Sequence, residues 1–390
     1  MKKILVAFLT VCFVSTLSGQ QEERSSGGLL IGAADVGVGF GHVSRVTGLR
    51  FNWSDDELEY VNGLNFTLWK PAPGPWQGTI NGFAIGIVAP AAEEINGVGL
   101  SLGAILAERK ATGILAGGLA VVSKGDINGI AFGGLAVVGQ GSITGATLSF
   151  GGIVSQRDLV GINVAGLGTV SQGDMTGINF AGLGTVAQGN MTGLNYAGLG
   201  TVSQGSMKGI TISGLGTVAQ GDMIGINVAG LGTVAQGDMW GVNLAGLGLV
   251  AQGEMTGINL SGLGTVAQGA MTGINMAGLG VITQKELAGI NLTLGLMRAE
   301  KGATGLNIAV YKNESRSIRG INLGIGWTES TSLTGLTVAG YNRTYGRQSG
   351  LTLGLLNHAE DLLGIQVGLF NIVESNPSWA KYLPLINVRF

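Results

Sequence analysis

The sequence is poor in charge, histidine and cysteine. Only 11% of its 390 residues are Asp, Glu, Lys or Arg, whereas a soluble globular protein usually has about 25%. The single cysteine, Cys12, lies near the N-terminus, so the rest of the chain has no disulfide and no thiol chemistry. The formal net charge of -2 gives no basic surface for nucleic acid. This composition argues against an ordinary soluble globule and against a nucleic-acid-binding protein.

Long apolar runs are also absent, because glycine, asparagine or glutamine interrupts every segment before it reaches the ~20 residues of a membrane helix. Residues 1–20 have a basic start at Lys2 and Lys3, an apolar middle and small residues before Gln20. This order is typical of a secretory signal peptide, with cleavage expected within residues 18–20. We therefore expect an exported protein.

Glycine is abundant, with 73 residues, and much of it belongs to an internal repeat. A 16-residue unit recurs with an opening glycine, a following aliphatic residue and then, in most copies, an asparagine. The repeat-defining glycines are Gly161, Gly177, Gly193, Gly209, Gly225, Gly241, Gly257 and Gly273. The repeat-defining asparagines include Asn163, Asn179, Asn195, Asn227 and Asn243.

Apolar and small or polar positions alternate with period two inside each unit, which predicts β-strands. The closing segment of each copy, as in Gln172-Gly173-Asp174, favours a tight turn. We expect irregular strands in residues 21–96, regular repeats in residues 97–304, and shortened repeats with a C-terminal strand in residues 305–390. These parts would form one continuous domain from about residue 27 to residue 390.

The first architecture that fits is an up-and-down antiparallel β-barrel of about 20 to 23 strands, with one strand per 14–16-residue repeat. Strands of about 10 to 12 residues would span the apolar band of a membrane. The column that contains Val164, Phe180 and Tyr196 requires hydrophobicity but no fixed shape, which suits lipid better than a packed core. The asparagine positions would then line a polar lumen.

The alternative is a parallel β-solenoid with one coil per repeat. A barrel places successive turns on opposite sides of the membrane, so odd and even copies should differ, yet their turns do not. The turn position holds Asp158, Asp174, Asn190, Ser206, Asp222, Asp238 and Glu254. Stacked coils would make the asparagines a hydrogen-bonded ladder. The inward residues of such a coil would be Ala165, Leu167, Val170, Gly173, Met175 and Ile178.

Two C-terminal units, G-L-T-L-G-L-L-N from Gly350 and G-I-Q-V-G-L-F-N from Gly364, are followed by an aliphatic segment that contains Pro384. This part resembles a family of bacterial surface-repeat proteins with G-h-Q-h-G-L-h-N units, where h is any apolar residue. The resemblance implies a secreted, surface-associated bacterial protein. The core copies depart from that pattern, because they carry asparagine where the family favours glutamine.

The chain ends on a strand in which Ile386, Val388 and Phe390 alternate. This ending resembles the signal by which outer-membrane barrels are delivered to their assembly machinery. The expected partners are therefore outer-membrane lipid and that machinery, and the expected location is the outer membrane or cell surface of a Gram-negative-type bacterium. No ligand or protein partner follows from the sequence.

Few residues offer chemistry. His42 and His358 are far apart and have no neighbouring cysteine or paired carboxylate, so we interpret them as isolated polar residues. Asp174, Asp222 and Asp238 could form a cation-binding ladder with Glu254, but turn-forming carboxylates explain the pattern better. We assign no catalytic, cofactor-binding or metal-binding residue and expect no enzyme. The expected function is a weakly selective pore or structural barrel, or alternatively an exported solenoid that serves as an adhesion or protein-interaction scaffold.

Overall fold

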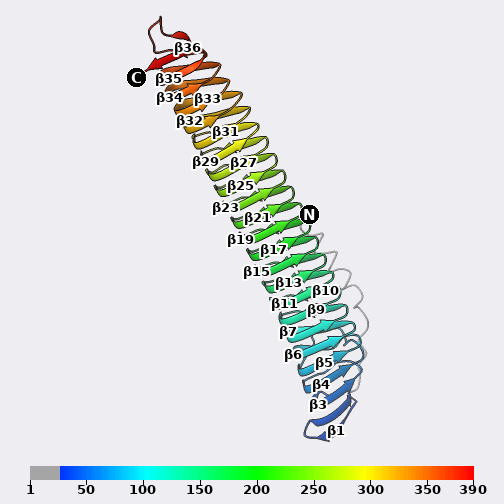
Figure 1. The fold of residues 1–390 in the computed structure, drawn as a ribbon. Helices are drawn as coiled ribbons and strands as arrows, with labels where there is room; N and C mark the ends of the chain where they lie inside the picture. Colours follow the sequence, from blue (N-terminus) through cyan, green and yellow to red (C-terminus); the bar gives the residue numbers. More distant parts are fainter. Residues whose placement is uncertain (1–26) are drawn as a thin grey trace. The chain divides into compact units, whose positions relative to one another are not determined.

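The computed structural model describes residues 27–390, and the expected signal peptide lies outside the described residues. The described part is built of β-strands and turns. It contains no helix long and apolar enough to cross a membrane. The chain divides after Gln172 into two compact units, here called unit 1 (residues 27–172) and unit 2 (residues 173–390). Both are drawn in Figure 1 as series of stacked strands.

Unit 1 contains the strands β1 (Gly28–Ala33), β2 (Val36–Gly41), β3 (Arg45–Asn52), β4 (Tyr60–Thr67), β5 (Thr79–Gly86), β6 (Ala91–Ser101), β7 (Ala104–Gly117), β8 (Ala120–Ser123), β9 (Asp126–Gly133), β10 (Ala136–Gly139), β11 (Ile143–Ser149), β12 (Gly152–Ser155), β13 (Leu159–Ala165) and β14 (Gly168–Ser171).

Unit 2 contains the strands β15 (Met175–Ala181), β16 (Gly184–Ala187), β17 (Met191–Ala197), β18 (Gly200–Ser203), β19 (Met207–Ser213), β20 (Gly216–Ala219), β21 (Met223–Ala229), β22 (Gly232–Ala235), β23 (Met239–Ala245), β24 (Gly248–Ala251), β25 (Met255–Ser261), β26 (Gly264–Ala267), β27 (Met271–Ala277), β28 (Gly280–Thr283), β29 (Glu286–Thr293), β30 (Leu296–Ala299), β31 (Gly302–Ala309), β32 (Lys312–Leu323), β33 (Trp327–Val338), β34 (Tyr341–Leu353), β35 (Leu356–Val373) and β36 (Tyr382–Arg389).

Each regular repeat forms one coil with a long and a short strand. In unit 2, β21 and β22 make one such coil, and β21 pairs in parallel with β23, sixteen residues later, so that Met223 lies beside Met239. The short strand β22 pairs with β24 in the same way. Unit 1 follows the same rule, since β9 pairs in parallel with β11 and Ile127 lies beside Ile143. Each unit is therefore a parallel β-solenoid.

The expected antiparallel barrel with one strand per repeat is wrong, and the alternative of one coil per repeat is confirmed. The physical reason is the turn between the two strands of a coil. Gly230 and Leu231 reverse the chain inside the repeat, so the next copy starts where the previous one started. Identical copies then pair in register with themselves, which also explains why odd and even turns do not differ.

Five side chains of each coil face inward, and they differ in part from those expected. In the coil of β21 and β22 the inward residues are Met223, Asn227, Ala229, Thr233 and Ala235, none more than 3% exposed. Met175 and Ala165 are buried as expected. Leu167 and Ile178, however, face outward with exposures of 56% and 46%. The interior is narrow, so small polar residues and flexible methionine fill it instead of leucine and isoleucine.

The repeat-defining glycines bring adjacent backbones together. Gly225 has a φ of +120°, which residues with a side chain rarely adopt. A Cβ atom at this position would lie 2.1 Å from the carbonyl oxygen of Gly209 in the preceding coil. Gly161 in unit 1 has the same conformation, with a φ of +118°. These glycines are therefore structural.

The terminal strands run against the direction of the others. In unit 1, β1 pairs antiparallel with β2. In unit 2, β36 pairs antiparallel with β35, which places Ile386 beside Val367 and Val388 beside Ile365. Phe390 follows β36 and is 90% exposed. The role of Ile386, Val388 and Phe390 as an assembly signal stays a prediction.

Substitution of Gly225 by alanine should lower the free energy of unfolding by about 2 kcal/mol or more, because it adds backbone strain and a clash with the preceding coil. Gly232 is a matched control in the same coil, since its added Cβ would meet its nearest atom at 3.6 Å. Gly232→Ala should change stability by less than about 0.5 kcal/mol. Urea unfolding followed by circular dichroism measures both, and equal effects would contradict the assignment.

Candidate interaction surface

Asparagines form one column in the interior of unit 2, where most of their amides donate a hydrogen bond to the next coil. The Nδ2 atom of Asn227 donates to Oδ1 of Asn243 at 2.9 Å, and Asn243 donates to Asn259 at the same distance. The series continues through Asn259, Asn275 and Asn291 to Asn307. Asn163 in unit 1 is also fully buried. The asparagine column is thus a structural ladder and lines no lumen.

The ladder is interrupted where Thr211 replaces asparagine. Asn195 accepts from Asn179 at 2.9 Å, but its own Nδ2 atom is buried without a hydrogen-bond partner. Thr211 lies beside Asn195 in the parallel pair of β17 and β19. Its side chain is too short to continue the ladder, so one buried donor is left unsatisfied.

The turn carboxylates are used by the backbone. Oδ1 of Asp222 accepts a hydrogen bond from the amide of Asp238 at 2.9 Å, and Oδ1 of Asp238 accepts from the amide of Glu254 at 2.7 Å. Each side chain therefore joins its turn to the next one, which confirms the turn interpretation. Among residues 27–390, no group of three or more His, Cys, Asp or Glu side chains could hold a metal ion.

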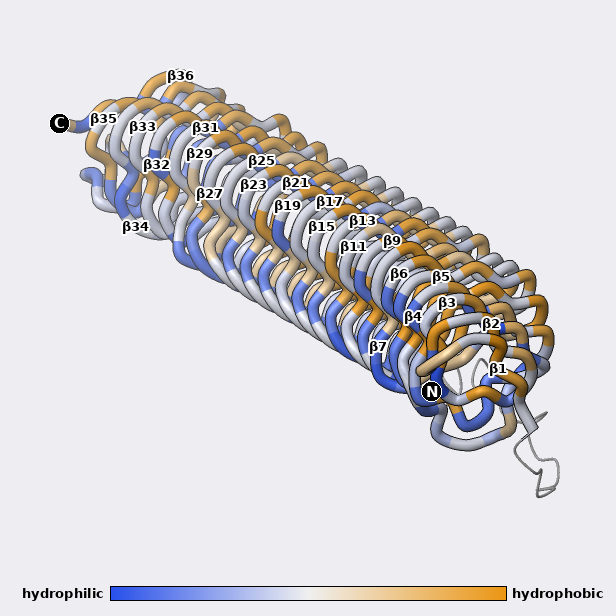
Figure 2. The backbone as a smooth tube through the Cα atoms, turned by 90° about the horizontal axis from the view of Figure 1, so that it is seen from below, coloured by the Kyte–Doolittle hydropathy of each residue, from blue (hydrophilic) through white to orange (hydrophobic). Residues whose placement is uncertain are grey.

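The outward side of the long strands in unit 2 carries two apolar columns, which we call the apolar face. In β21 these columns are represented by Ile226 and Val228, and Ile226 is 42% exposed. One column contains Ile178, Leu194, Ile210, Ile226, Val242, Ile258, Ile274 and Ile290. The other contains Phe180, Tyr196, Ile212, Val228, Leu244, Leu260, Met276 and Leu292. Figure 2 shows hydrophobic and hydrophilic residues following separate sides of the coils in unit 2.

Leucines at the nearby turn extend this surface and form what we call the leucine edge. Its members are Leu183, Leu199, Leu215, Leu231, Leu247 and Leu263, each 46–48% exposed. Their backbones are hydrogen-bonded from coil to coil, as in the bond from the amide of Leu231 to the carbonyl of Leu215 at 2.7 Å. The apolar surface therefore continues around the turn.

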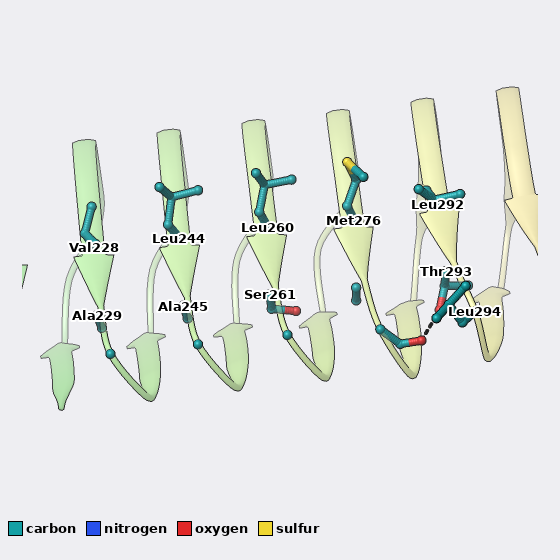
Figure 3. Close-up of a pocket in the computed structure, with 15 residues that line it drawn as sticks. Val228, Ala229, Leu244, Ala245, Leu260, Ser261, Met276, Leu292, Thr293 and Leu294 are labelled. Carbon is teal, nitrogen blue, oxygen red and sulfur yellow. Dashed lines mark hydrogen bonds between the residues drawn. The ribbon is translucent and has the colours of Figure 1, made fainter. Parts of the chain in front are cut away.

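A shallow groove of about 690 Å³ runs beside the apolar face between Val228 and Leu294. Val228, Leu244, Leu260, Met276 and Leu292 form its ridge, as Figure 3 shows. Its floor consists of small residues such as those at positions 229, 230, 245 and 246. The floor glycines cannot be replaced without a clash, since a Cβ at Gly230 would lie 1.9 Å from the carbonyl oxygen of Gly214. Close backbone packing thus keeps the groove open.

The short strands expose a narrower apolar surface. Their single outward valine column includes Val186, Val202, Val218, Val234 and Val250, each 37–39% exposed. The residue two positions after each valine is polar and lies in the turn that follows the short strand, as Gln236 does after β22. The two sides of the coil therefore differ mainly in the width of their apolar surface, since Ile226 is 42% exposed and Val234 is 37% exposed.

Unit 1 has an exposed aromatic surface and a buried ion pair. Phe40 stacks on Phe51 with ring centroids 5.7 Å apart, and Trp53 stacks on Trp69 at 6.0 Å. The fully buried Arg50 pairs with Asp55 at 2.7 Å.

The surroundings of this ion pair are polar. Asp55 also accepts hydrogen bonds from Asn52, Asn65, Thr67 and the amide of Ala91. Burial lowers the pKa of Arg50, while Asp55 opposes that shift. This network joins the three strands β3, β4 and β6 around one carboxylate, which points to a structural role.

Charged residues gather near the C-terminal end of unit 2. Arg298, Glu314, Glu329, Arg343 and His358 occupy one register position on successive strands. Nε2 of His358 lies 3.2 Å from Oε1 of Glu374. His42, the other histidine, lies in unit 1 directly after β2.

The hydrogen bond from Lys312 lowers the pKa of Glu329, and a bond from Tyr345 adds to that effect. The bond from Arg347 likewise lowers the pKa of Asp361. These contacts form a mixed-charge ladder, so they offer no single-sign site for an ion.

Comparison with protein-family models, curated proteins and solved structures finds no match for this chain. The case for a function therefore depends on the geometry. The sequence pattern predicts an outward, apolar column at Val164, Phe180 and Tyr196. It does not predict the leucine edge, because Leu167 is expected inside the coil. The leucine between two glycines in each copy is the sequence signal for this edge.

Substitution of Thr211 by asparagine should raise the free energy of unfolding by about 0.5 to 1.5 kcal/mol, because the new amide would accept from Asn195 and continue the ladder.

Asn259→Ala should lower the free energy of unfolding by about 1 to 3 kcal/mol, because it leaves polar groups of Asn243 and Asn275 unpaired. Urea unfolding measures both changes. A loss of stability in the Thr211→Asn chain would contradict the ladder account.

The stability of the folded chain should decrease as the pH is lowered through the acid range. The folded-state pKa of Glu329 is depressed, so its contribution is fully present above its unfolded pKa of about 4.3 and is lost as pH falls through the folded value. The thermal midpoint should therefore drop between pH 6 and pH 3. Lys312→Met should make the drop shallower. An identical drop in this variant would contradict the role of the Lys312 contact.

Proposed function

We propose that this chain is an exported, non-enzymatic scaffold at a bacterial cell surface that binds another macromolecule along the apolar face of unit 2. The observation that carries the proposal is the exposure of the same aliphatic positions in coil after coil. Ile178, Ile226 and Ile258 are each 37–46% exposed. The next outward residue along each of these strands is also apolar, namely Phe180, Val228 and Leu260.

Packing of the solenoid does not explain these residues. The coil interior is filled by methionine, asparagine, alanine and threonine, and the coils are joined by backbone hydrogen bonds. The outward column could therefore be polar without loss of the fold. A contiguous apolar patch on a monomer is usually no larger than about 300 to 600 Å², so a longer face points to a binding surface.

Export and surface location are supported by the signal-like residues 1–20 and by the resemblance of the C-terminal repeats to bacterial surface-repeat proteins. The pore function depended on the barrel architecture and is not proposed. An extended solenoid presents one long, regular surface, which suits a scaffold.

A photo-crosslinking amino acid placed at Leu231 should give adducts in intact cells that export the chain, because the leucine edge would contact the partner. Val234 in the same coil is the matched control, with an exposure of 37% against 47% for Leu231. Adducts resolved by mass on a denaturing gel should appear at Leu231 and be absent at Val234. Absence at both positions, or equal adducts, would contradict the proposal.

A further inference from the structure

We propose that the occupant of the apolar face is a second copy of this chain, bound face to face in a two-fold symmetric dimer. This inference deepens the proposed function and rests on it. It draws on the periodicity, shape, size and charge of the surface formed by the apolar face, the groove and the leucine edge of unit 2.

The periodicity of the face favours a partner with the same repeat. Adjacent coils are joined as parallel strands, so equivalent side chains such as Ile210 and Ile226 recur every ~4.8 Å along the stack. Side chains with this spacing interdigitate without voids only with a surface of equal spacing. A second copy of the same face meets this requirement over its whole length.

The shape of the face is self-complementary. The ridge of Val228, Leu244 and Leu260 runs beside the groove with its floor of small residues. A two-fold axis that lies parallel to the columns, between the ridge and the groove, brings the ridge of one copy over the groove of the other, and the reverse contact forms at the same time. A flat lipid surface would not enter the groove in this way.

The size of the face meets the needs of a stable dimer. The apolar columns continue beyond β29 to β35 through Leu306, Ile321, Leu336, Leu351 and Ile365, so the apolar surface extends about 58 Å at ~4.8 Å per coil. Across the strand, from Ile226 to Gly230 where the chain turns, it covers about 13 Å at ~3.3 Å per residue. The product is on the order of 750 Å², close to the value of about 800 Å² per partner in a standard interface. The valine column on the short strands is a single residue wide and does not reach this area.

The charge distribution allows identical copies to meet. The apolar columns and the leucine edge contain no charged residue. Lys208 and Arg319 lie at the margin of the face, each directly before the opening glycine of its repeat. The carboxylates Asp222, Asp238 and Glu254 lie at the other turn of the coil. Face-to-face contact therefore brings no like charges together across its centre.

Sedimentation equilibrium of the full chain between about 1 and 50 µM tests the inference, because a standard interface of this size supports association in that range. We expect twice the chain mass for the wild type. Ile226→Lys with Ile258→Lys should weaken dimerisation at least ~100-fold, because two charges would enter the apolar contact. The matched control, Val218→Lys with Val250→Lys, has the same spacing and similar exposure on the short strands and should remain dimeric.

A monomeric wild type over this range overturns the inference, as does equal weakening by the two double variants. If a monomeric chain still forms adducts of other mass at Leu231 in cells, the scaffold function stands and only the self-association fails. If the monomeric chain forms no adducts at Leu231, both the scaffold function and the self-association are contradicted. Flotation of a monomeric chain with phosphatidylcholine vesicles overturns the dimer in favour of a lipid surface. Should the Ile226→Lys and Ile258→Lys chain not fold, Leu231→Gln with Leu247→Gln supplies the same comparison.

Discussion

The parallel, in-register pairing of each repeat with the next one is the interaction on which the structure of each unit depends. Every long strand donates to and accepts from strands that carry nearly the same sequence, sixteen residues away in the regular part of unit 2. The glycine column makes this pairing close, because a Cβ at Gly225 or Gly241 would meet the preceding carbonyl oxygen at 2.1 to 2.2 Å. The chain therefore uses glycine to bring backbones together, and its glycine content is no sign of disorder.

In-register stacking converts each sequence position into a column of like residues. Inside the coil this gives an amide ladder, which holds the copies in register because an asparagine within it, such as Asn243, has one amide partner in the preceding coil and one in the next. Outside it gives continuous apolar columns, which no single repeat could present alone. The same pairing thus produces both the stability of the units and the length of the surface that we propose for binding.

The sequence predicted the repeat, the strands, the turn role of the carboxylates and the possibility of an asparagine ladder. It could not decide between barrel and solenoid, because Ile226 and Val228 would face outward in both, toward lipid in one and toward a partner or solvent in the other. The Gly-Leu-Gly turn produces a solenoid and not a barrel, because it reverses the chain inside each copy. The same turn makes Leu231 an exposed residue. Period-two reasoning alone could not locate this reversal. The buried Arg50 network was also missed, because its partners come from positions 52, 55, 65, 67 and 91 and share no local pattern.

The central claim is that equivalent positions of neighbouring repeats lie side by side. Spin labels at Val234→Cys and Val250→Cys, which are partners in the parallel pair of β22 and β24, test it by electron paramagnetic resonance. In-register stacking places the two backbones ~5 Å apart, so the spectrum of the doubly labelled chain should show strong dipolar and exchange broadening that is absent from either single label. A doubly labelled spectrum equal to the sum of the two single spectra would contradict the account.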